Sequence, residues 1–357
     1  MNARAGSGGE LQAAELAALR RCLAIGNAAS GSTSPNPPVG AVVLDASGHP
    51  VGGGATQPPG GPHAEIVALN QAGAAALGGT LIASLEPCAH QGRTGPCTAA
   101  IRAAGITRVV FGSADPNPVA GGGSEVLRTE GIDVVGGHLL DEVHRSALGR
   151  WLTAIDLGRP HVTWKYAATL DGRVAAADGT SRWITSEPAR ADVHRLRAEL
   201  DAIVVGSGTV LADDPQLTVR DGAGELALRQ PIRMVFDRRG RVPAGARVRD
   251  QSAPTVVWVD ALPEALRGMY EAGVRTVLLE GGPTLAAAFL RAACVDRVVA
   301  YLAPALLGAG PTVVTDLGIP SIGQALRLDV EDVITIGADV RITARLAASG
   351  GPTVTEE

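Results

Sequence analysis

The sequence predicts two consecutive α/β domains, and three observations lead to this fold class. Short runs rich in Val and Ile alternate with Ala- and Leu-rich segments of helical length along the whole chain. A break, Gly158-Arg159-Pro160, divides this alternation into two halves. The 357 residues, 46% of them hydrophobic and 19% charged, are enough for two packed cores. Helices should therefore cover a central sheet in each half.

The first half alternates strands and helices around polar loops. An amphipathic run from Glu10 predicts the first helix. The Gly- and Pro-rich segment 114–123 is predicted as a long loop. Strands are expected over 41–45, 80–86, 107–113 and 133–137, and helices after Pro62, after Cys97, over 124–131 and over 139–158.

The second half repeats the pattern, with a mixed sheet that ends in an antiparallel pair over 332–346. Its strands are expected over 161–170, 202–209, 232–237, 255–259, 275–282 and 297–304, and its helices over 187–199, 262–273 and 283–293. The domains are accordingly expected over 10–157 and 158–348, with disordered tails at 1–9 and 349–357.

Charge and apolar patterning argue against several classes of protein. The net charge of −5 disfavours a dedicated nucleic-acid binder, because phosphate contacts need a basic surface. No apolar run is long enough to span a membrane, and the N-terminal segment lacks the apolar core of a signal peptide. We therefore expect a cytoplasmic protein with no membrane or nucleic-acid partner. Cys22 and Cys294 are expected to be isolated core thiols.

Four residues between Pro62 and Cys97 form the pattern of a zinc-dependent deaminase. His63 and Glu65 stand two apart, and Cys88 and Cys97 follow, which fits H-x-E…P-C…C. One imidazole and two thiolates balance the charge of Zn²⁺ and leave its fourth position for a water. Glu65 is suited to move protons between that water and a leaving amine. Hydrolytic deamination is therefore the predicted chemistry of the first half.

A closed structural zinc site, or a pair of buried thiols, is the alternative interpretation of these residues. A closed site needs a fourth ligand, and His90 is the only nearby candidate. We interpret His90 instead as a contact to the substrate. Exchange of a metal-bound water would separate the two interpretations, because a closed site has no such water.

Two segments of the first half resemble a known family. The run LEPCAHQGRTGPC, with eight residues between its cysteines, and the upstream SPNPPVGAVV are similar to the deaminase half of the bifunctional riboflavin-biosynthesis deaminase/reductases. Gly95 departs from the family pattern, which usually has a second Pro there. The resemblance implies a cytidine-deaminase-like three-layer domain. It assigns zinc binding to His63, Cys88 and Cys97, acid/base catalysis to Glu65, and substrate contacts to Asn36, His90 and Arg93.

Two glycine-containing turns of the second half lie between a strand and a helix. In VVGSGTVLADDP and LLEGGPTLAAAF, the glycines let main-chain amides approach an anion, and the following helix N-terminus favours negative charge. Each turn suits either a dinucleotide pyrophosphate or a simple tight connection. No G-x-G-x-x-G follows a first strand, which disfavours an ordinary Rossmann domain.

Four motifs of the second half resemble the reductase half of the same family: Lys165 to Arg173, Ser181 to Ser186, Val205 to Arg220 and Glu280 to Leu285. The resemblance implies a dihydrofolate-reductase-like α/β fold, NADPH as cofactor and a ribose phosphate substrate. The implied cofactor contacts are Ala167, Trp183, Thr209, Asp213, Gly282, Pro283, Thr284, Leu285, Ala286, Ala287 and Ala288. The implied substrate contacts are Ser181, Arg197, Leu217, Arg220 and Glu280.

Lys165 is the only lysine in a chain that otherwise uses arginine. Either the site requires a compact, titratable ammonium, or this lysine has survived by chance. By motif, Lys165 and Glu280 are the candidates for the proton donor or charge stabiliser that hydride transfer needs. The cofactor stays open on the residues alone: Asp237 suits a ribose hydroxyl, whereas Arg238 and Arg239 suit a 2′-phosphate.

Taken together, these features predict a two-activity enzyme of riboflavin synthesis. It would remove the 2-amine of 2,5-diamino-6-ribosylamino-4(3H)-pyrimidinone 5′-phosphate and then reduce the ribosyl group to ribityl with NADPH. By resemblance, it would form a homo-oligomer, a dimer or a tetramer. Two other functions stay open, a single-activity deaminase with an inert second half and a non-catalytic protein with a structural zinc. NADPH oxidation would exclude the first, and water exchange the second.

Overall fold

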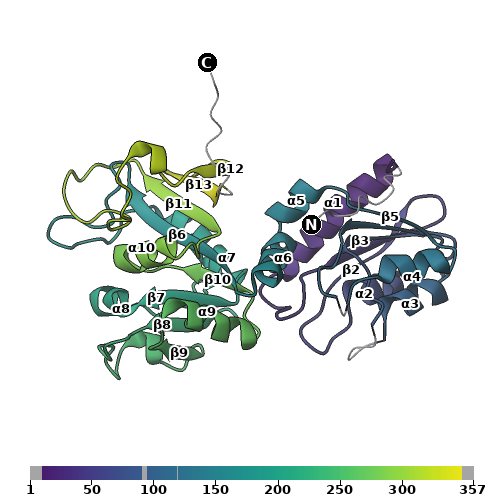
Figure 1. The fold of residues 1–357 in the computed structure, drawn as a ribbon, viewed down its shortest axis with the longest axis horizontal. Coiled ribbons are helices and arrows are strands. Elements are labelled where there is room, and N and C mark those ends of the chain that lie inside the picture. Colours follow the sequence, from purple (N-terminus) through teal and green to yellow (C-terminus); the bar gives the residue numbers. More distant parts are fainter. Residues whose placement is uncertain (1–9, 91–94, 119, 348–357) are drawn as a thin grey trace, which may run out of the picture. The chain divides into compact units, whose positions relative to one another are not determined.

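The computed structural model describes residues 10–90, 95–118 and 120–347. The predicted tails, 1–9 and 349–357, lie outside these residues. The chain divides into two compact units, each with its own sheet (Figure 1). One unit runs to Pro160 and also includes Met269–Arg275, and the other begins at His161.

The first unit is built on a five-stranded sheet in the order β2-β1-β3-β4-β5. β1 pairs antiparallel with β2 and β3, whereas β3, β4 and β5 are parallel and need helical crossovers. The strands are β1 (Gly40–Leu44), β2 (Pro50–Ala55), β3 (Thr80–Leu85), β4 (Arg108–Ser113) and β5 (Asp133–Gly136). The helices are α1 (Ala13–Ala29), α2 (Ala64–Ala72), α3 (Cys97–Ala103), α4 (Gly123–Thr129), α5 (Leu140–Arg145) and α6 (Ala147–Leu157).

Both faces of this sheet are apolar, because successive strand residues point to opposite sides. Val42, Ile82 and Val110 pack against α1 on one face. Leu81 and Val109 pack among residues of α2 and α3 on the other. The first unit therefore has the three layers that the sequence predicted.

β2 is a strand that the sequence analysis did not predict. Its sequence, PVGGGA, has few of the β-branched residues that mark strands. The glycines are needed because α2 packs closely on this strand. A Cβ at Gly52 would lie 2.2 Å from the carbonyl oxygen of Ala68, and one at Gly54 would lie 2.6 Å from Val67 Cβ. This contact fixes α2, and with it the residues at its start, over the sheet.

The single helix predicted over 139–158 is two helices, α5 and α6, separated at Ser146. Ser146 has extended main-chain angles, and its hydroxyl accepts a hydrogen bond from the N–H of Gly149 at 3.5 Å as the N-cap of α6. The apolar periodicity continues across this cap, so periodicity alone does not reveal the break.

The second unit contains an eight-stranded mixed sheet in the order β12-β13-β11-β6-β10-β7-β8-β9. The strands from β11 to β9 are parallel, and β13 and β12 add an antiparallel edge. The strands are β6 (His161–Thr169), β7 (Ala202–Gly206), β8 (Ile232–Phe236), β9 (Thr255–Trp258), β10 (Thr276–Leu279), β11 (Arg297–Ala303), β12 (Leu328–Ile336) and β13 (Asp339–Leu346). The helices are α7 (Glu187–Ala198), α8 (Ser207–Asp213), α9 (Leu262–Glu271) and α10 (Pro283–Arg291).

The carboxyl ends of the parallel strands meet at one edge of this sheet, which is where ligands of open α/β sheets gather. Gly206, Phe236 and Glu280 come from the ends of β7, β8 and β10 or directly after them. Among the described residues, no helix combines the length and the apolar character needed to cross a membrane.

Candidate active sites

Three predicted zinc ligands come together in the first unit. His63 is the N-cap of α2, Cys97 is the first residue of α3, and Cys88 follows the end of β3. One side-chain donor atom from each residue lies within 4.8 Å of the other two. In the described part of the chain, no fourth His, Cys, Asp or Glu joins this group. The structure therefore brings together the ligands of an open site.

The spacing of the three donors suits a tetrahedral zinc ion. His63 Nδ1 lies 3.4 Å from Cys97 Sγ and 3.6 Å from Cys88 Sγ. Zn–N and Zn–S bonds of about 2.0 and about 2.3 Å at tetrahedral angles separate the two donor atoms by about 3.5 Å. Both cysteines are free thiols. One imidazole and two thiols at these distances therefore fit zinc.

Glu65 and the two thiols are buried together at this site. Glu65 is 4% exposed, and burial raises the pKa of its carboxyl group. The hydrogen bond from the Cys97 thiol lowers the pKa of Cys88, and the same contact raises the pKa of Cys97. The N–H of Cys97 also donates to Cys88 Sγ at 3.5 Å. The site therefore stabilises a thiolate beside a carboxyl group that is suited to accept and return a proton.

Glu86, which the sequence analysis did not single out, ties the loop after β4 to the strand end that carries Cys88. Its buried carboxylate accepts hydrogen bonds from the N–H groups of Asp115, at 3.2 Å, and Ser124, at 2.9 Å. At the end of this loop, a Cβ at Gly123 would lie 1.8 Å from the carbonyl oxygen of Pro87. The predicted loop over 114–123 is thus held against the metal site at both of its ends.

The other predicted residues of this site are expected substrate contacts. Asn36 is half-buried, and its N–H donates to the carbonyl oxygen of Thr33 at 2.9 Å. His90 is also half-buried, and its Nδ1 is enclosed with no hydrogen-bond partner among the described residues. Arg93 lies outside the described residues.

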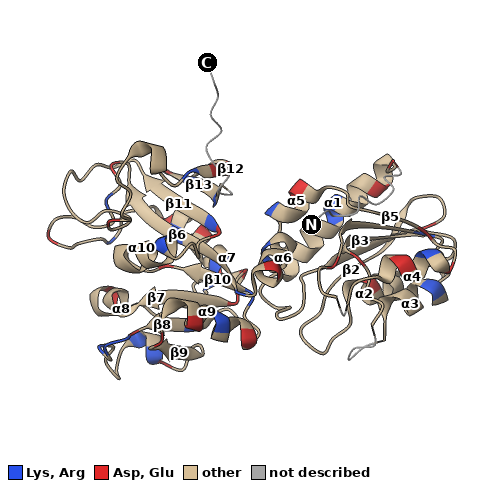
Figure 2. Cartoon of the chain, viewed as in Figure 1, with Lys and Arg blue, Asp and Glu red and all other residues tan. Residues whose placement is uncertain are grey.

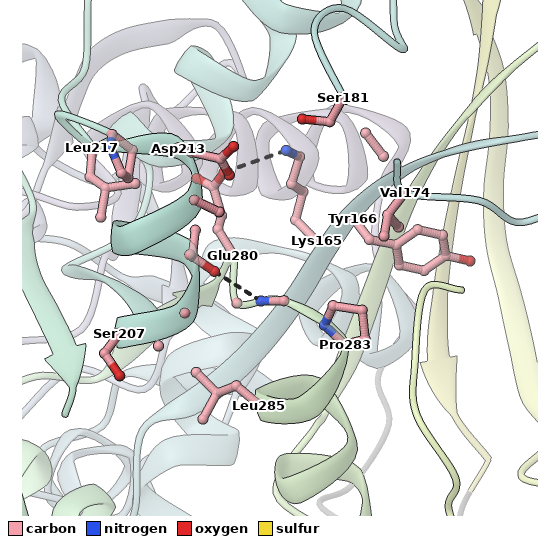
Figure 3. A pocket seen from close by; sticks show the side chains of 18 of the residues that line it. Lys165, Tyr166, Val174, Ser181, Ser207, Asp213, Leu217, Glu280, Pro283 and Leu285 are labelled. Atoms are coloured by element: carbon pink, nitrogen blue, oxygen red, sulfur yellow. Dashed lines mark hydrogen bonds and ion pairs between the residues drawn. The ribbon is translucent and has the colours of Figure 1, made fainter. Parts of the chain in front are cut away.

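A cavity of about 1330 Å³ lies at the carboxyl ends of the parallel strands in the second unit (Figure 3). Ala286 and Ala287 do not line it, because they are fully buried on the core side of α10. The other predicted residues of the second half line the cavity: Lys165, Ala167, Ser181, Trp183, Arg197, Thr209, Asp213, Leu217, Arg220, Glu280, Gly282, Pro283, Thr284, Leu285 and Ala288.

Glu280 joins Lys165 and Arg197 at the wall of this cavity. Arg197 donates to Glu280 through Nε at 2.5 Å and Nη2 at 3.0 Å. Lys165 Nζ lies 3.4 Å from Oε2 of Glu280 (Figure 3). Although burial opposes ionisation, the two cations lower the pKa of Glu280 to about 2. Glu280 therefore remains a carboxylate near neutral pH. Of Lys165 and Glu280, the two predicted candidates, the carboxylate can only accept hydrogen bonds, whereas a lysine side chain donates them.

The two predicted glycine turns lie side by side in the cavity. The N–H of Gly282, at the start of α10, donates to Thr209 Oγ1 in α8 at 3.2 Å. Gly281 and Gly282 leave the main chain accessible directly before the N-terminus of α10, which favours an anion. This arrangement suits the pyrophosphate of a dinucleotide.

Asp237 is not available to a ribose hydroxyl. It is 1% exposed, and its Oδ2 accepts a hydrogen bond from the N–H of Val242 at 2.8 Å, which closes the turn after β8. The same turn presents Arg238, Arg239 and Arg241 to the cavity, and Figure 2 shows basic residues in this region. The burial of Asp237 and the three arginines therefore favour a 2′-phosphate over a free ribose hydroxyl at this turn, which fits NADPH.

Protein-family models match both halves of the chain. Residues 160–342 match the RibD C-terminal domain, and residues 13–113 match the cytidine and deoxycytidylate deaminase zinc-binding region. The two matches fall on the unit with the cavity and on the unit with the three-ligand cluster.

Curated relatives match along most of the chain. The riboflavin biosynthesis protein RibD of Mycobacterium tuberculosis is 50% identical over 315 residues, which cover 88% of this chain and 92% of the relative. RibD of Escherichia coli is 39% identical over 359 residues, which cover 90% and 96%.

Two solved structures align over 94% of this chain and 99% of their own, at 34% identity. RibD of Acinetobacter baumannii has a TM-score of 0.85. A Thermotoga maritima protein, described as a diaminohydroxyphosphoribosylaminopyrimidine deaminase/5-amino-6-(5-phosphoribosylamino)uracil reductase, has a TM-score of 0.86.

Proposed function

The chain belongs to the RibD family of bifunctional riboflavin-biosynthesis deaminase/reductases, and from that premise we propose which of its residues perform the two reactions. The predictions of the family, of two activities and of zinc and NADPH as cofactors are confirmed. The observation that supports the residue assignment best is the convergence of His63, Cys88 and Cys97 beside Glu65.

The first unit deaminates 2,5-diamino-6-ribosylamino-4(3H)-pyrimidinone 5′-phosphate. His63, Cys88 and Cys97 hold the zinc, which supplies a Lewis acid that makes a water acidic near neutral pH. Glu65 takes a proton from the attacking water and returns one to the leaving amine. The oxygen of water replaces the 2-amine, and ammonia leaves. Asn36, His90 and Arg93 bind the substrate.

The second unit reduces the ribosyl group of the deaminated product to ribityl. NADPH supplies the hydride, which is added at C1′ of the opened ribose, and a proton from the protein completes the reduction. Lys165 gives that proton, because Glu280 is held as a carboxylate by its two cations. Ser181, Leu217 and Arg220 bind the ribose phosphate together with Glu280 and Arg197.

The two glycine turns would hold NADPH. Gly282, at the start of α10, and Thr209 would bind its pyrophosphate, and Trp183 would offer a flat apolar surface to its nicotinamide ring. Arg238 and Arg239 receive the 2′-phosphate, and the geometry of Asp237 supports this because its carboxylate is already bonded to Val242.

The protein is further proposed to act in the cytoplasm as a homo-oligomer. Its cysteines are free thiols, which suits a reducing compartment. The edge strand β12 exposes Val330 by 62% and Val333 by 58%, and a second copy of the chain would cover such an edge. Sedimentation of the purified protein measures the assembly directly.

A one-pot assay with the diaminopyrimidinone ribosyl phosphate tests the proposed function. Ammonia should appear first and NADPH absorbance should fall afterwards. A zinc chelator should stop both changes with this substrate but leave NADPH oxidation intact when the deaminated compound is supplied. Ammonia release without NADPH loss would reduce the activity to deamination, and no release of ammonia would contradict the assigned metal site.

A further inference from the structure

A four-residue segment, Leu217 to Arg220, crosses the wall of the cavity without belonging to a strand of the sheet. Leu217 has φ +53° and is buried, so this segment is held in a conformation that a non-glycine residue rarely adopts. Under the proposed function, on which this inference rests, Leu217 and Arg220 contact the phosphorylated substrate. What holds the segment in place therefore determines how well that substrate binds.

Side chains, more than a strand partner, fix the main chain of this segment. Arg197 Nη1 donates to the carbonyl oxygen of Thr218 at 3.1 Å. Gln230 both accepts from the N–H of Val219 at 2.7 Å and donates to its carbonyl oxygen at 2.9 Å. From the main chain, the N–H of Ala227 donates to the carbonyl oxygen of Val219 at 3.1 Å, and Arg220 forms one isolated antiparallel bridge with Leu226. The N–H of Arg220 is held by His194, whose Nδ1 accepts it at 3.3 Å.

The contact to Arg220 specifies the protonation state of His194. A ring nitrogen accepts a hydrogen bond only through its lone pair, so Nδ1 carries no proton and the imidazole is neutral, with its proton on Nε2. His194 lies one helical turn before Arg197 in α7, and both side chains line the cavity. Two residues on one face of α7 therefore hydrogen-bond to the main chain of the segment, Arg197 at Thr218 and His194 at Arg220.

We propose that His194 is a positioning residue of the reductase site, which in its neutral form anchors the main chain of Arg220 and so sets the affinity for the phosphorylated substrate. The guanidinium of Arg220 donates to the carbonyl oxygen of Gly224 at 2.7 Å and to Gln216 Oε1 at 2.8 Å, so its side chain is held independently of His194. Loss of the His194 contact therefore acts on the main chain at Arg220 and on the segment that leads to it.

The surroundings of His194 favour the neutral form. Burial lowers the pKa of the imidazole, and Arg197 on the same helix lowers it further. Glu280, which follows β10, and the carbonyl oxygen of Thr218 raise the pKa of His194, and Arg220 lowers it. Acidification below this lowered pKa places a proton on the ring and removes the acceptor for the N–H of Arg220. Substrate affinity should therefore fall as the pH falls.

Two variants separate this role from a merely structural one. His194→Leu removes the acceptor, and its KM for the deaminated substrate should rise about tenfold, as expected for one lost hydrogen bond. His194→Asn carries an amide oxygen at the position of Nδ1 and should restore most of the affinity. The Kd for NADPH and the rate of ammonia release should stay within about twofold in both variants, which also shows that the chain is folded.

A pH series on the wild-type chain and His194→Asn completes the test. The wild-type KM should rise more steeply toward acid than that of the Asn variant, because the titration of the substrate phosphate is common to both. An unchanged KM in His194→Leu, or an Asn variant as impaired as the Leu variant, would overturn the role of His194. Absence of NADPH oxidation by the wild-type chain would instead contradict the proposed function.

Discussion

Lys165 Nζ lies 3.4 Å from Oε2 of Glu280, and this carboxylate also receives two hydrogen bonds from Arg197. The sequence left open whether Lys165 or Glu280 provides the proton for reduction. The geometry separates their roles, because a carboxylate held between two cations does not become an acid near neutral pH. We therefore propose that Lys165, the only lysine of the chain, supplies the proton.

Replacing Lys165 by Arg should lower the kcat of NADPH oxidation by at least about 100-fold, because a guanidinium keeps the charge but does not release its proton. Stopped-flow absorbance with the deaminated substrate measures this rate. Ammonia release from the diamino substrate should be unaffected. A fully active variant would show that Lys165 is present by chance, as the sequence alone allowed.

Replacing Glu280 by Gln should destabilise the second unit by about 3 kcal/mol, since two partly buried cations lose their shared partner. In the wild-type chain the pKa of Glu280 lies below its ordinary value, so its contribution is fully present above about pH 4.5 and is lost as the pH falls toward about 2. Urea unfolding measures both effects. The transition of the second unit is the one that NADPH shifts to higher urea concentration. Glu264→Gln, at an exposed position, serves as the control.

Replacing Glu65 by Gln should reduce ammonia release by at least about 100-fold while zinc remains bound, because the proton carrier is lost and the three ligands stay. Zinc content by mass spectrometry and NADPH oxidation with the deaminated substrate should match the wild-type chain. Loss of zinc in this variant would instead make Glu65 a ligand or a structural residue.

Motif chemistry was predictable from the sequence to different degrees in the two units. The proposed zinc ligands His63, Cys88 and Cys97 could be found because their residue types and order are specific to the chemistry. Glu86 could not, because a buried carboxylate that accepts main-chain N–H groups has no sequence pattern of its own. The burial of Asp237 was equally hidden, since a strand-end Asp has the same sequence context whether it binds a ligand or closes a turn.

The sequence did not reveal strand β2 or the break between helices α5 and α6, because close packing and a helix cap decide these features rather than residue propensity. The glycines of β2 allow α2 to approach, which removes the β-branched signal by which strands are recognised. Ser146 divides a continuous apolar periodicity through one hydroxyl. In β2 the local sequence argues against a strand, and around Ser146 it argues for one continuous helix. In both cases a contact that the local pattern does not reveal decides the structure.

Replacing Arg238 by Ala should weaken NADPH binding about tenfold and leave NADH binding unchanged, because only NADPH carries the 2′-phosphate that this guanidinium would receive. Fluorescence titration of each dinucleotide gives both dissociation constants without turnover. Arg249→Ala is the matched control, since Arg249 follows the same strand but does not line the cavity. An equal loss of affinity for NADH and NADPH would place Arg238 at a part of the cofactor that both share. Because Asp237 accepts a hydrogen bond from the N–H of Val242, the selectivity for NADPH over NADH should depend on the arginines of this turn rather than on the carboxylate beside them.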